Sequence, residues 1–259
     1  MKHAQTNGRP RQSRGRGRIG VVVPVTNTNL EPDMMMLAPE GVSLHFSRSG
    51  GYDVDAIPDE KQMRQYSDQH SPEVVDNLRL CRSDVILYGC TSATLAQGPA
   101  YDRQFRQEIE AQTGIPAITA ASALVEAISD VGDKGSKAFA LSSPYVARLN
   151  DLAISFIEAF GHRCVGRADA EKPLGNDDVA ALSPDDVMAL AERANNKEAQ
   201  VIVLSCTDMR AAEAVPEIER RLSKPVVTSN QALMAWAIRR LGLPFEGTVL
   251  ANHRLVADR

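Results

Sequence analysis

The chain has 259 residues, of which 43% are hydrophobic, enough for one large domain or two medium ones with a sizeable core. Its formal net charge is −4, but residues 1–18 carry six basic residues and no acid, so the remainder holds 23 basic and 33 acidic residues, a net charge of −10. This acidic balance argues against a nucleic-acid partner, and we expect the basic tail 1–18 to be disordered.

The sequence carries no signal for a membrane or for secretion. It lacks an 18-residue apolar stretch, so we expect no transmembrane helix and no membrane partner, and its N-terminus has no apolar signal segment. The four cysteines (Cys81, Cys90, Cys164 and Cys206) are too few for a disulfide scaffold in a chain of this size. We therefore expect free thiols and a cytoplasmic location.

The first half of the chain alternates apolar strands with helical patterns. IGVVVPVTN (19–27) predicts a strand, residues 60–80 a helix, VILYGCTSA (85–93) a strand that ends at a cysteine, and residues 100–112 a helix. GIPAITAASALVEAI (114–128) then combines a short strand with an apolar helix. Short, nearly continuous apolar strands between helices indicate a parallel sheet covered on both faces.

The second half repeats this plan. KAFALSSPY (137–145), VIVLSCTDM (201–209) and SKPVVTSNQALMAWAI (223–238) follow the three first-half segments at offsets of 120, 116 and 109 residues. Helical patterns lie at 146–160, 182–196 and 210–222. We therefore predict two similar α/β domains of the Rossmann-like, flavodoxin-like type, each with three layers and a parallel sheet, related by a pseudo-twofold axis.

The expected domains are residues 19–119 plus 228–259 and residues 120–227, with the active site in the cleft between them. In open α/β sheets, ligands bind beyond the carboxyl ends of the strands. Cys90 and Cys206 lie at such ends in the two copies, so the repetition predicts that they face each other across one cleft.

Both cysteines are followed by hydroxyl side chains, Thr91 and Ser92 in the first copy and Thr207 in the second. A thiol just before a helix N-terminus is expected to have a lowered pKa, because the exposed N–H groups and the helix dipole favour the anion. The same N–H groups can bind a substrate carboxylate. A buried packing thiol is the alternative for either cysteine alone, but the matched pair favours a nucleophile and its partner.

Three further residues are candidates for substrate binding. Asn27 follows the first strand and can donate to a carboxylate, or can act as an ordinary turn or N-cap residue. Tyr145 follows Pro144 at the matching position and can donate to developing negative charge, or can simply pack. Asn176 has both a turn reading and a binding reading, and Asp208 reads as a charge near a helix N-terminus.

Other motifs carry no function. GRGRIG (15–20) matches GxGxxG but precedes the first strand, whereas a dinucleotide-binding turn must follow a strand and open a helix. The five histidines lack metal-ligand spacing, so we expect no metal. Cys81 and Cys164 have no counterpart in the other half and are expected to be packing or bystander residues.

At these residues the sequence resembles the aspartate/glutamate racemase superfamily, in particular its branch of maleate cis–trans isomerases and arylmalonate decarboxylases. PVTNTNLEPD (24–33) resembles the isomerase opening Pro-Ser-Ser-Asn-Thr-Thr-Met-Glu, YGCTSAT and LSCTDM match two cysteine motifs, and SPY matches a Thr/Ala-Pro-Tyr turn. Asn176 stands where the isomerases have a substrate-binding Asn. The likeness covers nearly all of residues 18–240.

This resemblance implies a cofactor-independent isomerase in which the Cys90 thiolate adds to the alkene of maleate or a related dicarboxylate. Cys206 would act from the opposite face as acid, base or electrostatic partner. The substrate, a small carboxylic acid, would be held by donors from both halves: Asn27, Thr91, Ser92, Tyr145, Asn176 and Thr207. The superfamily is often dimeric, which implies a homodimer.

The same residues allow other reactions. Two cysteines that flank an α-carbon could racemise or epimerise an Asp/Glu-like, hydantoin-like or ectoine-derived acid, one removing the proton and the other returning it. The arylmalonate decarboxylases have glycine in place of the first cysteine, so Cys90 counts against decarboxylation, although Thr91-Ser92 resembles their carboxylate cradle. A non-catalytic binder is the remaining alternative.

Overall fold

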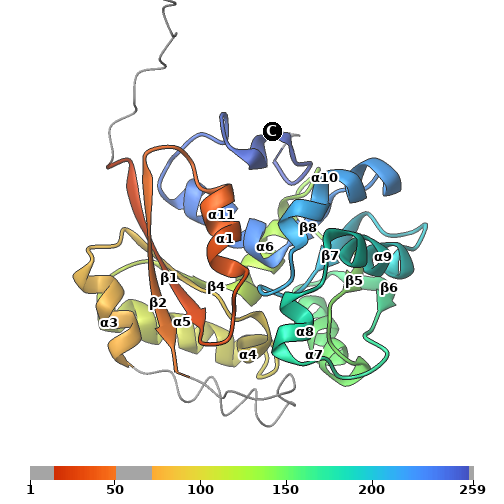
Figure 1. Ribbon diagram of the computed structural model, residues 1–259, viewed down its shortest axis with the longest axis horizontal. Coiled ribbons are helices and arrows are strands. Elements are labelled where there is room, and N and C mark those ends of the chain that lie inside the picture. Colours follow the sequence, from red (N-terminus) through yellow and green to blue (C-terminus); the bar gives the residue numbers. More distant parts are fainter. Residues whose placement is uncertain (1–14, 51–71, 257–259) are drawn as a thin grey trace, which may run out of the picture.

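The computed structural model describes residues 15–50 and 72–256, which form two four-stranded parallel sheets (Figure 1). The first sheet has the order β2-β1-β3-β4 and comprises β1 (Gly17–Pro24), β2 (Val42–Ser49), β3 (Val85–Tyr88) and β4 (Ala117–Thr119). The second has the order β6-β5-β7-β8 and comprises β5 (Ala138–Ser142), β6 (Arg163–Ala168), β7 (Val201–Leu204) and β8 (Val226–Thr228). Matching strands occupy matching places, so the predicted repeated α/β fold is confirmed.

Helices cover both faces of the first sheet. α3 (Pro72–Leu80) and α5 (Pro99–Thr113) pack against one face, and α1 (Leu30–Leu37) and α11 (Ser229–Arg240) lie on the other. The strands supply alternate residues to the two layers, as the period of two along a strand requires. Ile86 shares an apolar cluster with α3 and α5, whereas its neighbour Leu87 belongs to the cluster that contains α1 and α11.

The second sheet is covered in the same manner. α9 (Pro184–Ala194) and α10 (Ala211–Leu222) pack together against it. α7 (Ala147–Glu158) and α6 (Ala120–Asp130) contact the sheet and also reach elements of the first half. Two short helices, α4 (Thr91–Leu95) and α8 (Asn176–Ala180), and a final 3-10 turn, η1 (Val249–Asn252), complete the described elements.

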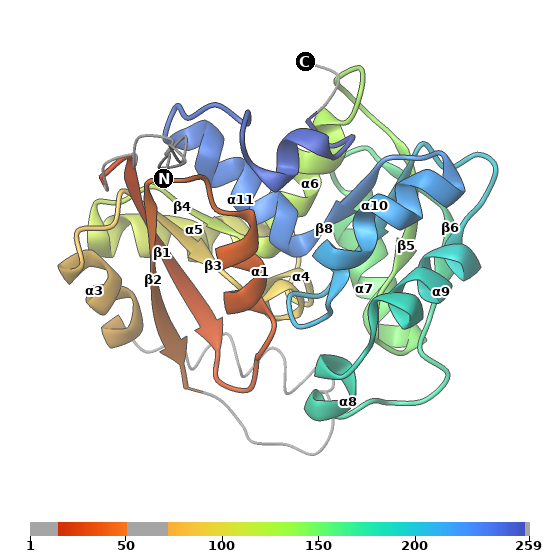
Figure 2. The same ribbon diagram turned by 45° about the horizontal axis from the view of Figure 1, so that its top comes forward.

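Two helices, α6 and α11, pack against each other between the two halves (Figure 2). Each begins directly after the last strand of a sheet, at a threonine whose hydroxyl caps the helix. Thr119 accepts from the Ser122 N–H at 3.1 Å, and Thr228 accepts from the Gln231 N–H at 3.1 Å. α6 also contacts β7 and β8, and α11 also contacts β3, so each helix packs on the sheet of the other half.

Several boundaries differ from the sequence prediction. The basic tail was predicted to end at residue 18, but β1 begins at Gly17, and both Gly17 and Arg18 pair with β2, so this boundary is wrong. Residues 1–14 lie outside the described part of the chain. Of the helix predicted at 60–80, residues 60–71 also lie outside the described part of the chain, and the remainder is α3 (Pro72–Leu80). The edge strands β2 and β6 were not predicted. The division into 19–119 plus 228–259 and 120–227 stays a proposal.

Candidate active site

The two matched cysteines are buried at the carboxyl ends of equivalent strands. Cys90 lies two residues beyond β3 and is the N-cap residue of α4, and Cys206 lies two residues beyond β7. Their exposed fractions are 9% and 5%. Gly89 brings the first turn close to its neighbours: a Cβ at this position would lie 2.2 Å from Leu30 Cδ2 and 2.7 Å from the Val22 carbonyl oxygen. Only glycine fits there without a shift.

The loops that carry the two cysteines are hydrogen-bonded to each other. The Thr207 hydroxyl donates to the Gly89 carbonyl oxygen at 2.8 Å, and the Asn27 amide donates to the Thr207 hydroxyl oxygen at 3.1 Å. The Asn27 side-chain oxygen, Oδ1, accepts the N–H groups of Asn29 and Leu30, at 3.1 and 2.8 Å, and so starts α1. Asn27 therefore has the turn role and also lies beside both cysteine loops.

Tyr145 joins the two cysteine loops from the turn after β5. Its buried hydroxyl lies in hydrogen-bonding contact with the Cys206 thiol and the Ser92 hydroxyl. The Ser92 Oγ is 3.9 Å from the Cys90 Sγ. Tyr145, Ser92, Cys90 and Cys206 thus form one cluster, which brings the matched cysteines of the two halves together.

Burial sets the protonation of this cluster. It raises the pKa of Cys90, and the N–H groups of Ala93 and Ser92 oppose this only in part. Burial, followed by the charge of Asp208, raises the pKa of Cys206 to about 12. Burial and the neighbouring Cys206 also raise the pKa of Tyr145 well above its ordinary value. The expected net lowering of the thiol pKa is therefore wrong, because desolvation outweighs the helix N-terminus.

Sequence reasoning gave Asp208 too small a role. Its Oδ1 accepts the backbone N–H groups of Thr28 and Asn29, at 2.8 and 3.0 Å, across the boundary between the halves. The Asn29 amide returns a hydrogen bond of 2.7 Å to the Asp208 carbonyl oxygen. Burial raises the pKa of Asp208 to about 6. The only signal in the sequence was its place directly after Cys206-Thr207.

The remaining predicted residues are placed differently. The buried Thr91 hydroxyl donates to the Ser229 hydroxyl at 3.0 Å, at the start of α11. Asn176 is the first residue of α8 and is partly exposed, so its substrate contact stays a prediction. Within residues 15–50 and 72–256, no group of three or more His, Cys, Asp or Glu could hold a metal ion, and no helix is long and apolar enough to cross a membrane.

Comparison with known proteins agrees with the resemblance noted above. The chain is 29% identical over 252 residues to a maleate isomerase of Pseudomonas putida, covering 91% of this chain and 97% of that one. The structure of Nocardia farcinica maleate cis–trans isomerase bound to TRIS superposes with a TM-score of 0.81 at 25% identity, covering 93% and 98% of the two chains.

A cysteine-to-serine variant of the Nocardia isomerase with a covalently bound succinylcysteine intermediate superposes with a TM-score of 0.77 at 24% identity, covering 88% and 94%. The arylmalonate decarboxylase family matches residues 19–255, nearly the whole of the described chain. The expected branch is thereby confirmed, and the protein belongs to the arylmalonate decarboxylase family.

Proposed function

We propose that this protein is a cofactor-independent maleate cis–trans isomerase with Cys90 as nucleophile and Cys206 as its partner. The observation that carries the proposal is the cluster of two buried cysteines, one from each half, around the hydroxyls of Ser92 and Tyr145. Curated relatives over most of the chain are maleate isomerases, and the Nocardia isomerase has been seen with a succinylcysteine intermediate. The presence of Cys90, at the position where the arylmalonate decarboxylases have glycine, also fits isomerisation better than decarboxylation.

In the proposed reaction, the Cys90 thiolate forms a C–S bond with one alkene carbon, and the π electrons move to the neighbouring carbon and its carboxylate. The Ser92 and Tyr145 hydroxyls donate to the developing charge. The Cys206 thiol, whose pKa of about 12 keeps it protonated at neutral pH, donates its proton to the neighbouring carbon. The former double bond can now rotate. Return of that proton to Cys206 and departure of the Cys90 thiolate give fumarate.

We further propose how the two carboxylates are held. The Asn27 amide uses one N–H on Thr207 and has a second N–H for a carboxylate. The hydroxyl protons of Thr91 and Thr207 point to Ser229 and to the Gly89 carbonyl, so these two threonines would contribute their backbone N–H groups and position the loops. Asn176 would approach from α8.

Proton NMR of the purified protein with maleate tests the function. The maleate alkene signal should disappear and the fumarate signal should grow, with no added metal or cofactor. If maleate is unchanged while solvent deuterium enters the α-position of aspartate, glutamate or a hydantoin, the protein is a racemase and the proposal is wrong. Inertness toward all of these, with cysteines that resist iodoacetamide, would identify a binder.

We also propose that the protein works as a cytoplasmic homodimer. Exposed apolar side chains on α1 (Met35 and Met36) and on η1 (Val249) lie on two elements that contact each other, which suits burial against a second copy. Sedimentation equilibrium should give twice the mass of the chain, and the double variant Met35→Glu/Met36→Glu should give the mass of one.

A further inference from the structure

Asn150, a fully buried residue of α7, holds the Tyr145 carbonyl directly and the Tyr145 N–H through Ser143. Its amide nitrogen donates to the Tyr145 carbonyl oxygen at 3.2 Å. Its side-chain oxygen accepts from the Ser143 hydroxyl at 2.6 Å, and the Ser143 oxygen in turn accepts the Tyr145 N–H at 3.1 Å. The backbone of the turn that presents the Tyr145 ring to the two cysteines is therefore held by Asn150 and Ser143.

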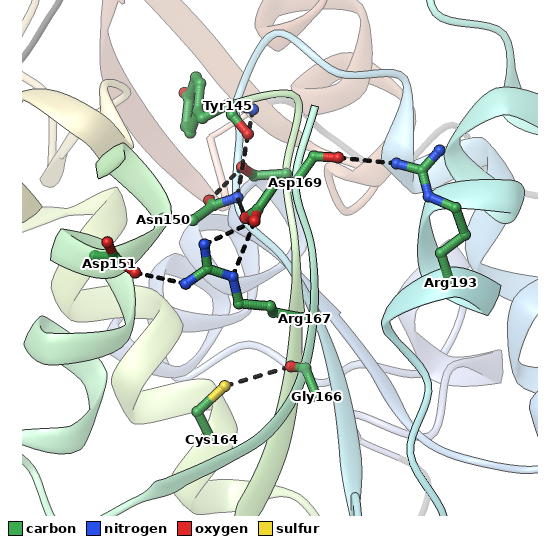
Figure 3. Close-up of polar contacts among 9 residues, drawn as sticks. Tyr145, Asn150, Asp151, Cys164, Gly166, Arg167, Asp169 and Arg193 are labelled. Carbon is green, nitrogen blue, oxygen red and sulfur yellow. Dashed lines mark hydrogen bonds and ion pairs between the residues drawn. The ribbon is translucent and has the colours of Figure 1, made fainter. Parts of the chain in front are cut away.

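The second N–H of the Asn150 amide donates to Asp169 Oδ1 at 2.8 Å, just beyond the end of β6 (Figure 3). Arg167 donates to the other oxygen of this carboxylate from Nε and Nη2, at 3.0 and 2.7 Å. Arg193 of α9 donates to the Asp169 carbonyl oxygen at 2.9 Å. Asn150 thus connects Tyr145 to a carboxylate that is itself held in place.

All three hydrogen-bonding groups of the Asn150 side chain, two N–H donors and one oxygen, have partners. A fully satisfied buried amide fixes one arrangement of its neighbours, because any other arrangement leaves a polar group unpaired in a low-dielectric interior. None of these groups faces a cysteine sulfur in the contacts above. Among these hydrogen bonds, those that lead to the cysteine cluster go through Tyr145.

We propose that Asn150 is a positioning residue that holds the Tyr145 hydroxyl between Ser92 and Cys206. This inference rests on the proposed isomerase function for its kinetic consequence, and on the contacts alone for its geometry. Loss of the Asn150 amide leaves the Tyr145 carbonyl with only the Ala170 N–H, at 2.9 Å, and deprives the Ser143 hydroxyl of its acceptor. The Tyr145 turn is then held less tightly, so its hydroxyl no longer meets the developing charge in one fixed place. Misplacement of about 1 Å in an active site can cost about 100-fold in rate.

A double-mutant cycle tests the proposal with the full chain. Asn150→Ala should lower kcat for maleate by about 10- to 100-fold with a smaller change in KM. In a Tyr145→Phe background, the same substitution should change kcat by no more than about twofold, because its effect acts through the absent hydroxyl. An equal fold-loss in both backgrounds overturns the proposal, since that is the result of a general structural role.

Two further variants guard against misfolding. Asp169→Ala removes the carboxylate that accepts from the Asn150 amide and should give a smaller loss of kcat than Asn150→Ala. This loss should again be absent in a Tyr145→Phe background. If Asn150→Ala does not fold, the cycle of Asp169→Ala with Tyr145→Phe decides whether Tyr145 is positioned in this way. Phe156→Leu is the matched control, because Phe156 is a buried residue of the same helix that packs against Phe160. It should lower the melting temperature without any kinetic dependence on Tyr145.

The iodoacetamide alkylation rate of Cys206, mapped by mass spectrometry, gives a readout that needs no turnover. Asn150→Ala should change this rate in the same direction as Tyr145→Phe, and the double variant should react at the rate of Tyr145→Phe alone. The exposed Cys81 should react at an unchanged rate and serves as the internal reference. If the wild-type protein fails to isomerise maleate, the proposed function is wrong, and the alkylation cycle still decides the role of Asn150. Additive changes in alkylation rate overturn that role.

Discussion

The Thr207 hydroxyl donates a hydrogen bond of 2.8 Å to the backbone carbonyl of Gly89, so the residue after one cysteine is tied to the residue before the other. The two positions are separated by 118 residues in the chain. Asn27 donates to the same hydroxyl oxygen, which completes a chain of three residues from both halves. The spacing of Cys90 and Cys206 is therefore set by a contact between the repeats.

Thr207→Val tests this contact at nearly constant volume. The substitution leaves the Gly89 carbonyl and one Asn27 N–H unpaired, which costs about 1–3 kcal/mol of unfolding free energy. We expect that loss in chemical denaturation, together with a fall in kcat. Thr94→Val is the matched control: the Thr94 hydroxyl is buried without a partner among the described residues, so its removal should cost little or even stabilise.

The cysteines should respond to serine substitution in three different ways. Cys90→Ser should nearly abolish turnover, because an alcohol of far higher pKa replaces the nucleophile. Cys206→Ser should let the protonated adduct on Cys90 accumulate, because serine or water can still deliver a proton to the carbon, whereas serine is a poor base for its removal. Mass spectrometry should then show a chain carrying one added maleate. Cys81→Ser should stay within a few-fold of wild type, since Cys81 is exposed and follows α3 rather than the carboxyl end of a strand. Near-normal activity of Cys90→Ser would exclude the covalent mechanism.

The activity should rise with pH through the neutral range. Burial raises the pKa of Cys90, so only a small fraction is thiolate in the free enzyme at pH 7. Because kcat/KM reports ionisation of the free enzyme, its value for maleate should increase about tenfold per pH unit between pH 6.5 and 8.5. A profile that is flat above pH 7 would mean that Cys90 is already ionised there.

Asp208 predicts a pH dependence of stability. Its folded-state pKa of about 6 lies above the ordinary 3.8, so the folded protein holds this proton more tightly than the unfolded chain does. The contribution of this proton to the free energy of unfolding is full below pH 3.8 and is lost as pH rises through about 6. Asp208→Asn, whose oxygen can accept the same two N–H groups, should gain at most about 3 kcal/mol over wild type at pH 7.5 and much less at pH 4.

Asp186→Asn is the control of opposite sign. Asp186 accepts from Ser183 in a capping box at the start of α9, and those hydrogen bonds lower its pKa. Its contribution is present above the unfolded pKa and lost in acid, so Asp186→Asn should be less stable than wild type at pH 7.5 and should converge with it below about pH 4. A stability difference for Asp208→Asn that is independent of pH contradicts the assignment of its pKa.

The central strands of both sheets were predictable because they are apolar at nearly every position, as β3 and β7 show with four buried residues each. The edge strand β2 was not, because its residues are mostly half-buried and include Ser43 and His45, which form a hydrogen bond with each other. The matched Cys-Thr pairs were visible in the sequence because they recur at one spacing.

What the sequence could not supply was the environment of those pairs. Whether the pKa of Cys90 is raised or lowered depends on how many atoms from other elements surround the sulfur, and no local sequence pattern encodes that number. The hydrogen bond that Asp208 accepts from the Thr28 N–H likewise depends on how the two halves are placed. Asn150 was hidden for the same reason, since it reads as one polar residue in an otherwise amphipathic helix.

The exchange of α6 and α11 between the sheets bears on how such a chain could arise. Each helix follows the last strand of one repeat and packs on the sheet of the other. One repeat alone would leave its sheet uncovered where that helix belongs, whereas two copies could complete each other by domain swapping. A swapped pair of identical single-repeat chains would already hold two facing cysteines, and fusion of the two genes would let Cys90 and Cys206 diverge into separate chemical roles.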